Sequence, residues 1–364
     1  MIRHRNQYYV SVSVGGSDVS FYFASASESG IDISRQLAKD TEAHFEKSQW
    51  DDEAFKNHGR EKIIAIYSSR VHDGLYAIAS ASMLASVMPN ALLCYPKLHK
   101  LLNPENIPSL QHMRRLEVDW SEADSKRNCM LTSWIESPSF EPLDVYDHIE
   151  SVLVDIYSNQ KEFRHDSSSE EGITILISYE AEKRAWIEQV EGFKSLFKRL
   201  VLEFSNVTVY VNGMTAPDEG AGLDFFDEIR VAEENFIADL QRTVPEVKFF
   251  HLFGFRMIEK IAQMHKVDYF VGPAISAVMV PALLGKPGFT YAGTRILKQH
   301  QPFFARLKSL KVVSIDQVSD ASEYLGLVRY DWAVGASDGT SYHIDPNYFE
   351  EAVFSDIQLK LGRS

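Results

Sequence analysis

The most informative pattern of apolar positions lies in residues 267–291, VDYFVGPAISAVMVPALLGKPGFTY, which predict a succession of strand, turn, helix and strand. An apolar run predicts a buried strand that Gly272 and Pro273 end, residues 276–284 predict an apolar helix, and residues 289–291 resume a strand. Ligands of open α/β sheets bind outside the carboxyl ends of strands, where helix N-termini present N–H groups to anions. The helix start is therefore a candidate ligand site, although an ordinary strand–helix–strand unit without a ligand explains the pattern equally well.

A similar alternation of strand and helix opens at Lys62. The run IIAIYSS predicts a buried strand, residues 73–88 predict a buried helix rich in alanine and leucine, and ALLCY predicts the next strand. A strand near residues 113–118 and a helix over 143–157 extend this first unit. The polar run NQKEFRHDSSSEEG that follows has the composition of an exposed linker.

A second α/β unit opens at Ile173, where ITILIS predicts a strand. The helix after it places apolar residues, Trp186 among them, at spacings of three or four, which predicts one buried face. The strands VTVYVNG, residues 249–253 and KVVSID continue the alternation. Residues 345–361 predict an acidic helix that packs back across the domains.

At the N-terminus, apolar residues alternate with polar ones on both sides of the turn GGSD, which predicts a β-hairpin, and residues 28–60 are polar and helical in part. The expected organisation is an appendage over 1–60, a Rossmann-like domain over 61–160, a linker over 161–172, a second Rossmann-like domain over 173–344 and a C-terminal helix over 345–364.

Composition limits the possible partners. The 364 residues carry a formal net charge of −14, so we expect no nucleic-acid partner, although a local basic pocket for a small anion stays compatible. The 2 cysteines lack metal-ligand spacing and fit a reducing cytoplasm. No signal peptide or membrane span is predicted, which leaves at most peripheral contact with the inner face of a membrane. The acidic pair Glu233-Glu234 is interpreted as a solvated face.

Two Rossmann-like halves joined by a polar linker describe the GT-B architecture, and the chain resembles the bacterial heptosyltransferase family of glycosyltransferases. The resemblance covers roughly residues 62–100 and 173–293. It is carried by the order of three runs: IYSSRVHDGLYAIASASMLASVMPNALL, ILISYEAEKRAWIEQVEGFKSLFKRL and FGFRMIEKIAQMHKVDYFVG.

One departure from the family follows Gly272. The family usually has Asn-Asp-Ser-Gly-Pro there and a later histidine, whereas this chain continues with Pro273, Ala274 and Ile275 and has Met279 further on. The acidic side chain that could hold hydroxyl groups of the donor sugar is therefore absent at Ala274. This absence favours a relative that binds without catalysis.

The resemblance implies an inverting, metal-independent sugar transfer, which needs a base for the acceptor hydroxyl and positive charge for the departing nucleoside diphosphate. Asp73, at the start of a helix and facing the cleft between the domains, is the candidate base, and His72 could assist or replace it. A helix-capping carboxylate is the alternative role of Asp73, and the two roles are compatible.

The candidate diphosphate site lies in the second domain. Lys183 and Arg184 stand between a strand end and a helix start, where cations can meet a diphosphate. Arg256, Gly272 and the backbone N–H groups near Ser276 complete the expected pocket. Arg295 and Lys298 are interpreted as solvated loop cations.

No Asp-x-Asp, P-loop, HExxH or dinucleotide-binding glycine motif occurs in the chain. The expected function is transfer of a sugar from a nucleoside diphosphate sugar to a cell-surface glycan or lipid-linked acceptor, with no cofactor besides this donor substrate. Two other functions stay open: a nucleotide-sugar epimerase, and a non-catalytic GT-B-like protein that binds a glycan or a protein. The sequence leaves the oligomeric state undetermined.

Overall fold

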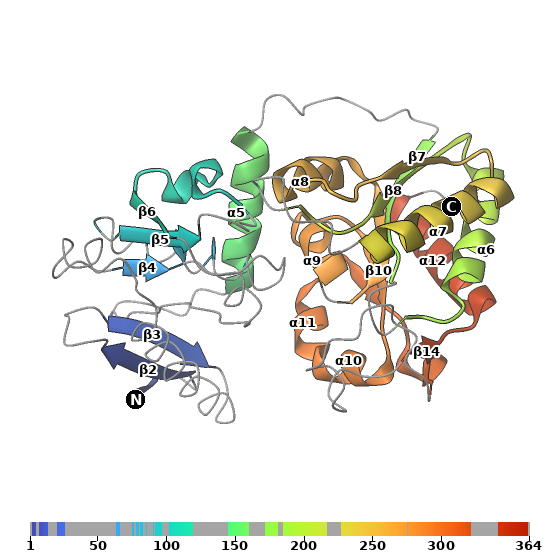
Figure 1. The fold of residues 1–364 in the computed structure, drawn as a ribbon. Helices are drawn as coiled ribbons and strands as arrows, with labels where there is room; N and C mark the ends of the chain where they lie inside the picture. Colours follow the sequence, from blue (N-terminus) through green and yellow to red (C-terminus); the bar gives the residue numbers. More distant parts are fainter. Residues whose placement is uncertain are drawn as a thin grey trace. The chain divides into compact units, whose positions relative to one another are not determined.

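The computed structural model describes residues 2–4, 7–13, 20–25, 63–65, 92–96, 102–118, 145–159, 172–180, 185–216, 227–274, 276–321 and 341–362, with scattered positions between 75 and 90. The chain divides into two compact units (Figure 1). One consists mainly of Met1–Ile156, and the other of Tyr157–Ala216 and Gly220–Ser364. Within the described residues, no helix is long and apolar enough to cross a membrane.

The first unit contains a parallel sheet, as the alternation after Lys62 predicts. Its strand order is β4-β5-β6, and these strands are β4 (Ile63–Ala65), β5 (Leu92–Pro96) and β6 (Arg114–Val118). Helical positions between β4 and β5, such as Leu75 and Ile78, are buried. The 3-10 turns η1 (Pro104–Asn106) and η2 (Pro108–Leu110) precede β6, and α5 (Val145–Asn159) follows it.

A separate antiparallel sheet in this unit consists of β1 (Ile2–His4), β2 (Gln7–Ser13) and β3 (Ser20–Ser25). The strands β2 and β3 pair with Val10 opposite Phe23. The predicted helical segment over 28–60 lies outside the described residues.

The second unit is built on a six-stranded sheet in which all neighbouring strands are parallel. In spatial order its strands are β12 (Leu310–Val312), β11 (Gly288–Tyr291), β10 (Tyr269–Pro273), β7 (Gly172–Ser178), β8 (Asn206–Asn212) and β9 (Lys248–His251). Parallel strands need crossover connections, and the predicted helices supply them.

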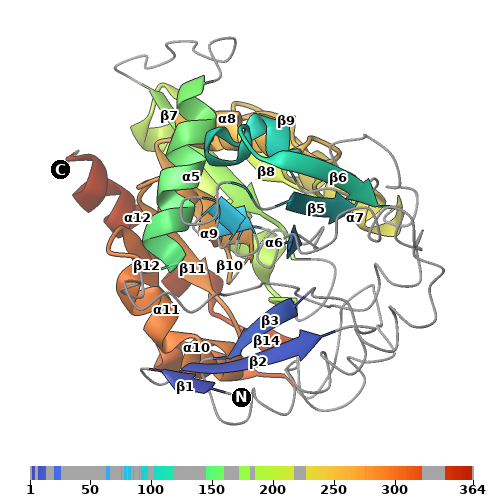
Figure 2. The ribbon, with the colours of Figure 1, turned by 90° about the vertical axis from the view of Figure 1, so that its left-hand side faces the viewer.

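Helices cover both faces of this sheet (Figure 1). The helices α6 (Gln189–Glu203), α7 (Asp227–Thr243) and α12 (Pro346–Leu361) contact one another in series, and α8 (Met257–Lys266) contacts α9 (Ser276–Leu283) on the other face. The helix α12 also contacts β11 (Figure 2). Smaller elements complete the unit: α10 (Thr294–Gln299), α11 (Gln301–Arg306), η5 (Ile315–Gln317), β13 (Ser319–Asp320) and β14 (Tyr342–His343).

An aromatic cluster joins α12 to the sheet. The ring of Phe349 on α12 lies 4.5 Å from that of Trp186, 5.4 Å from Phe193 on α6 and 5.7 Å from Tyr291 on β11. The indole Nε1 of Trp186 donates a hydrogen bond to the carbonyl of Ile344 at 3.0 Å. The interpretation of Trp186 as a core residue is therefore confirmed, although it precedes α6 instead of lying on it.

Two local predictions are wrong. The strand β10 runs through Gly272 and Pro273, because beyond Val271 it pairs only with β11, where the missing N–H of proline does not interrupt a second ladder. Arg295 and Lys298 are exposed as expected, but they lie on the helix α10 instead of in a loop, and β12 follows this helix.

Candidate functional site

The second unit has a topological switch point. The chain passes from β7 to β8 and β9 in one direction and then returns to place β10 on the other side of β7. In open α/β sheets the crevice outside the carboxyl ends of the strands at such a reversal is where ligands bind. The ends of β7 and β10 therefore define the candidate site.

A small hollow lies at this place, with room for about one water-sized group. We call it the switch-point hollow. Its described lining residues come from the end of β10, from the segments after β7, β10 and β11, and from α10 and β14: Glu180, Pro273, Ala274, Ala292, Gly293, Ile296 and Tyr342. Among these lining residues Glu180 carries the only carboxylate.

The backbone of Glu180 is held by one buried side chain. The amide Nε2 of Gln189 donates to the Glu180 carbonyl at 3.0 Å, and its Oε1 accepts from the Glu180 N–H at 3.1 Å. Gln189 is itself buried at the start of α6. The position of Glu180 at the rim of the hollow therefore does not depend on its own carboxylate.

A buried phenol lies near Glu180. The hydroxyl of Tyr291 donates to the carbonyl of Ser178 at 3.3 Å. Burial raises the pKa of Tyr291 well above its usual range, and the negative charge of Glu180 raises it further. The hydroxyl of Tyr291 therefore stays neutral and donates its hydrogen bond at the carboxyl end of β7.

A second polar group of residues, which we call the Lys260 cluster, lies at the ends of β7 and β8. The ammonium of Lys260, on α8, donates to Oδ1 of Asn212 at 2.8 Å and to the carbonyl of Gly213. Nδ2 of Asn212 donates to Oγ of Ser178 at 3.3 Å. Burial lowers the pKa of Lys260 to about 7, while the negative charge of Glu233 acts in the opposite direction.

Glu233 corrects one prediction from the sequence. Glu234 is exposed as expected, but Glu233 is only 3% exposed, and its Oε2 lies 2.7 Å from Nε2 of His251 at the end of β9. Burial raises the pKa of Glu233, and His251 and Lys260 partly counteract the rise. A Cβ at Gly213 would lie 2.4 Å from this carboxylate, so the close approach requires glycine.

Three of the predicted site residues fall within the described ranges. Gly272 is buried, and a Cβ there would lie 3.3 Å from Ser178 and 3.4 Å from Val278, so this glycine lets α9 pack against the sheet. Ser276 is exposed at the start of α9. Asp73, His72, Lys183 and Arg184 lie outside the described residues.

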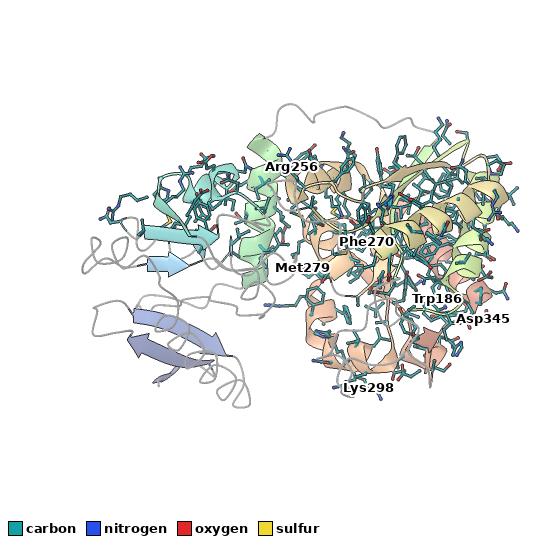
Figure 3. The ribbon with its side chains drawn as sticks, in the orientation of Figure 1. Trp186, Arg256, Phe270, Met279, Lys298 and Asp345 are labelled. Carbon is teal, nitrogen blue, oxygen red and sulfur yellow. The ribbon has the colours of Figure 1, made fainter. Side chains whose placement is uncertain are left out.

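Arg256 lies at the same sheet edge but not beside Gly272. Arg256 (Figure 3) is the N-cap of α8, the helix that follows β9 in the chain, and its guanidinium contacts the carboxylate of Glu259 at 2.9 Å. The strand β9 is three strand spacings from β10, about 14 Å. Arg256 and Ser276 could therefore contact only different parts of one extended ligand.

Sequence reasoning missed Glu180, Gln189 and Lys260. Signals for two of them are present in the chain. Glu180 is the second residue after the strand ITILIS. Lys260 stands three residues after Met257 and four before Met264, which places it on the buried side of α8. Within the described residues, no group of three or more His, Cys, Asp or Glu side chains is arranged to hold a metal ion.

No family model and no curated protein matches this chain. Among solved structures, E. coli ADP-heptose LPS heptosyltransferase II aligns with 82% of this chain and 99% of its own, at 14% identity and a TM-score of 0.44. The E. coli heptosyltransferase WaaC with ADP aligns with 68% of this chain and 99% of its own, at 9% identity and a TM-score of 0.33. The UDP-GlcNAc 2-epimerase from Methanocaldococcus jannaschii aligns with 72% of this chain and 68% of its own, at 10% identity and a TM-score of 0.35. At these sequence identities and TM-scores, the function has to be inferred from the residues of the chain itself.

Proposed function

We propose that the protein is an inverting, metal-independent glycosyltransferase of the GT-B class. It transfers a sugar from a nucleoside diphosphate sugar to a cell-surface glycan or a related lipid-linked acceptor. The observation that carries the proposal is the switch-point hollow between β7 and β10, with a carboxylate at its rim and the start of α9 beside it. The presence of a parallel α/β sheet in each unit supports the same class.

The proposal assigns separate residues to the two halves of the reaction. Asp73 accepts the proton of the acceptor hydroxyl, with His72 beside it, so that the oxygen can attack the sugar. Lys183 and Arg184 stabilise the negative charge on the departing diphosphate. Positive charge and backbone N–H groups can do this without a metal ion.

Further contacts extend the donor site. The exposed start of α9 at Ser276 offers backbone N–H groups to a phosphate oxygen. Gly272 contributes indirectly, by letting α9 pack against the sheet. Arg256, three strands away, is assigned to the far end of the donor.

The test is calorimetric titration with UDP, ADP, GDP and CMP of the wild-type protein and of Lys183→Ala and Asp73→Ala. We expect one nucleotide to bind. Loss of a charged hydrogen bond in Lys183→Ala should weaken it about tenfold to hundredfold, while Asp73→Ala keeps the affinity. With the matching sugar donor and an acceptor, loss of the base in Asp73→Asn should lower the transfer rate by about 10²–10⁴-fold.

Lys248→Ala is the matched control, because Lys248 is exposed at the amino end of β9, whereas the candidate site lies at the carboxyl ends of the strands. Its nucleotide affinity should equal that of the wild type. If none of the four nucleotides binds the wild-type protein, the transferase proposal fails, and a non-catalytic glycan- or protein-binding role takes its place.

A further inference from the structure

The lining of the switch-point hollow is chemically simple. Ala274, Ala292 and Gly293 have no side chain larger than a methyl group, and Pro273 and Ile296 are apolar. Among its lining residues, Glu180 and Tyr342 have side chains that can form hydrogen bonds. The hollow therefore suits one small polar group of a ligand whose neighbouring atoms are apolar.

The charge at the rim determines which polar group fits. An ionised carboxylate is an acceptor with about four lone-pair positions, so Glu180 can accept from a ligand in addition to any contact within the protein. A phosphate oxygen beside it would be repelled, and no described lining residue is a cation that could offset this. A hydroxyl group can donate to the carboxylate without this penalty.

The hollow also relates Glu180 to Ala274. The two residues line it from neighbouring strands, Glu180 after β7 and Ala274 after β10. The backbone N–H of Ala274 donates to the carbonyl of Tyr291 at 2.9 Å, which fixes this side of the hollow. A carboxylate is thus present at this place although the residue that follows β10 is an alanine.

We propose that the switch-point hollow receives a hydroxyl group of the donor's sugar ring and that Glu180 accepts its hydrogen bond. Glu180 is then a specificity-determining residue, and the diphosphate lies outside the hollow. This inference rests on the proposed transferase function. The site would then discriminate against sugars that lack this hydroxyl, because such sugars lose a hydrogen bond to a charged acceptor.

The test compares each nucleoside diphosphate with its sugar conjugate by calorimetry, using UDP and UDP-glucose, ADP and ADP-glucose, and GDP and GDP-mannose. For the base that binds, Glu180→Gln should weaken the conjugate about tenfold and leave the diphosphate unchanged, because a charged acceptor is replaced by a neutral one. Ala274→Val, which fills the hollow without changing the charge, should have the same selective effect.

Glu203→Gln makes the same change at an exposed position at the end of α6 and should alter neither affinity. Because the Glu180 backbone is held by Gln189, Glu180→Gln should keep the wild-type circular dichroism spectrum. Equal weakening of diphosphate and conjugate, or no change in either, would overturn the role of Glu180. Absence of any nucleotide binding by the wild type is a different result, which overturns the transferase function itself.

Discussion

At the scale of single residues, Lys260 occupies an environment in which lysine is rarely found. It is 1% exposed, yet its ammonium serves two acceptors at the end of β8, Asn212 and the carbonyl of Gly213. Asn212 in turn donates a hydrogen bond to the hydroxyl of Ser178 at the end of β7. The lysine therefore joins the ends of two strands next to the candidate site, and burial of its charge opposes folding.

This opposition predicts a pH dependence of stability. The folded-state pKa of Lys260 is about 7, below the value near 10.4 of an unfolded chain, so the unfolded chain binds more protons and the free energy of unfolding rises with pH between these values. From pH 7 to pH 9 the wild type should gain about 2 kcal/mol relative to Lys260→Met, in urea denaturation at both pH values. A difference between the two proteins that stays constant with pH would contradict the lowered pKa.

At the scale of elements, α12 closes the second unit. Its N-cap is Asp345, whose Oδ1 accepts from the N–H groups of Asn347 and Tyr348, both at 2.9 Å (Figure 3). The guanidinium of Arg199 on α6 contacts Glu350 and Glu351 of α12 and lies 3.9 Å from the ring centre of Phe354. The predicted helix over residues 345–361 is thus confirmed, and it packs on α6 and β11.

The cap can be tested without changing the core. Asp345→Ala leaves two N–H groups of α12 without their acceptor and should lower the free energy of unfolding by about 1 kcal/mol in urea titration. Asp345→Asn keeps a side-chain oxygen and should stay within about 0.5 kcal/mol of the wild type. If the two variants lose the same stability, the charge of Asp345 matters instead of the cap.

At the scale of the whole molecule, the second unit has its own core, covered on both sheet faces by its own helices. We expect a fragment of residues 172–364 to fold alone and unfold in one cooperative transition, measured by circular dichroism in urea. An aggregated fragment, or one without a transition, would show that its core needs residues before 172.

The order of strands and helices in this unit could be predicted because each element is a local pattern. The buried Glu233 also has a local signal, since it stands four residues after Ile229 and three before Phe236, two buried positions of α7. Its partner His251 has none, because only the order of strands brings the end of β9 to that helix. Glu180 and Ala274 likewise meet only because β10 returns beside β7.

The position of Phe349 has a consequence for synthesis of the protein. Its ring fills the space between Trp186, Phe193 and Tyr291, which the ribosome makes much earlier. Until residue 361 has left the exit tunnel, these rings have no cover from α12, and the nascent unit presents an aromatic surface of the kind that chaperones bind. Translation that stops before residue 345 therefore leaves an aggregation-prone sheet.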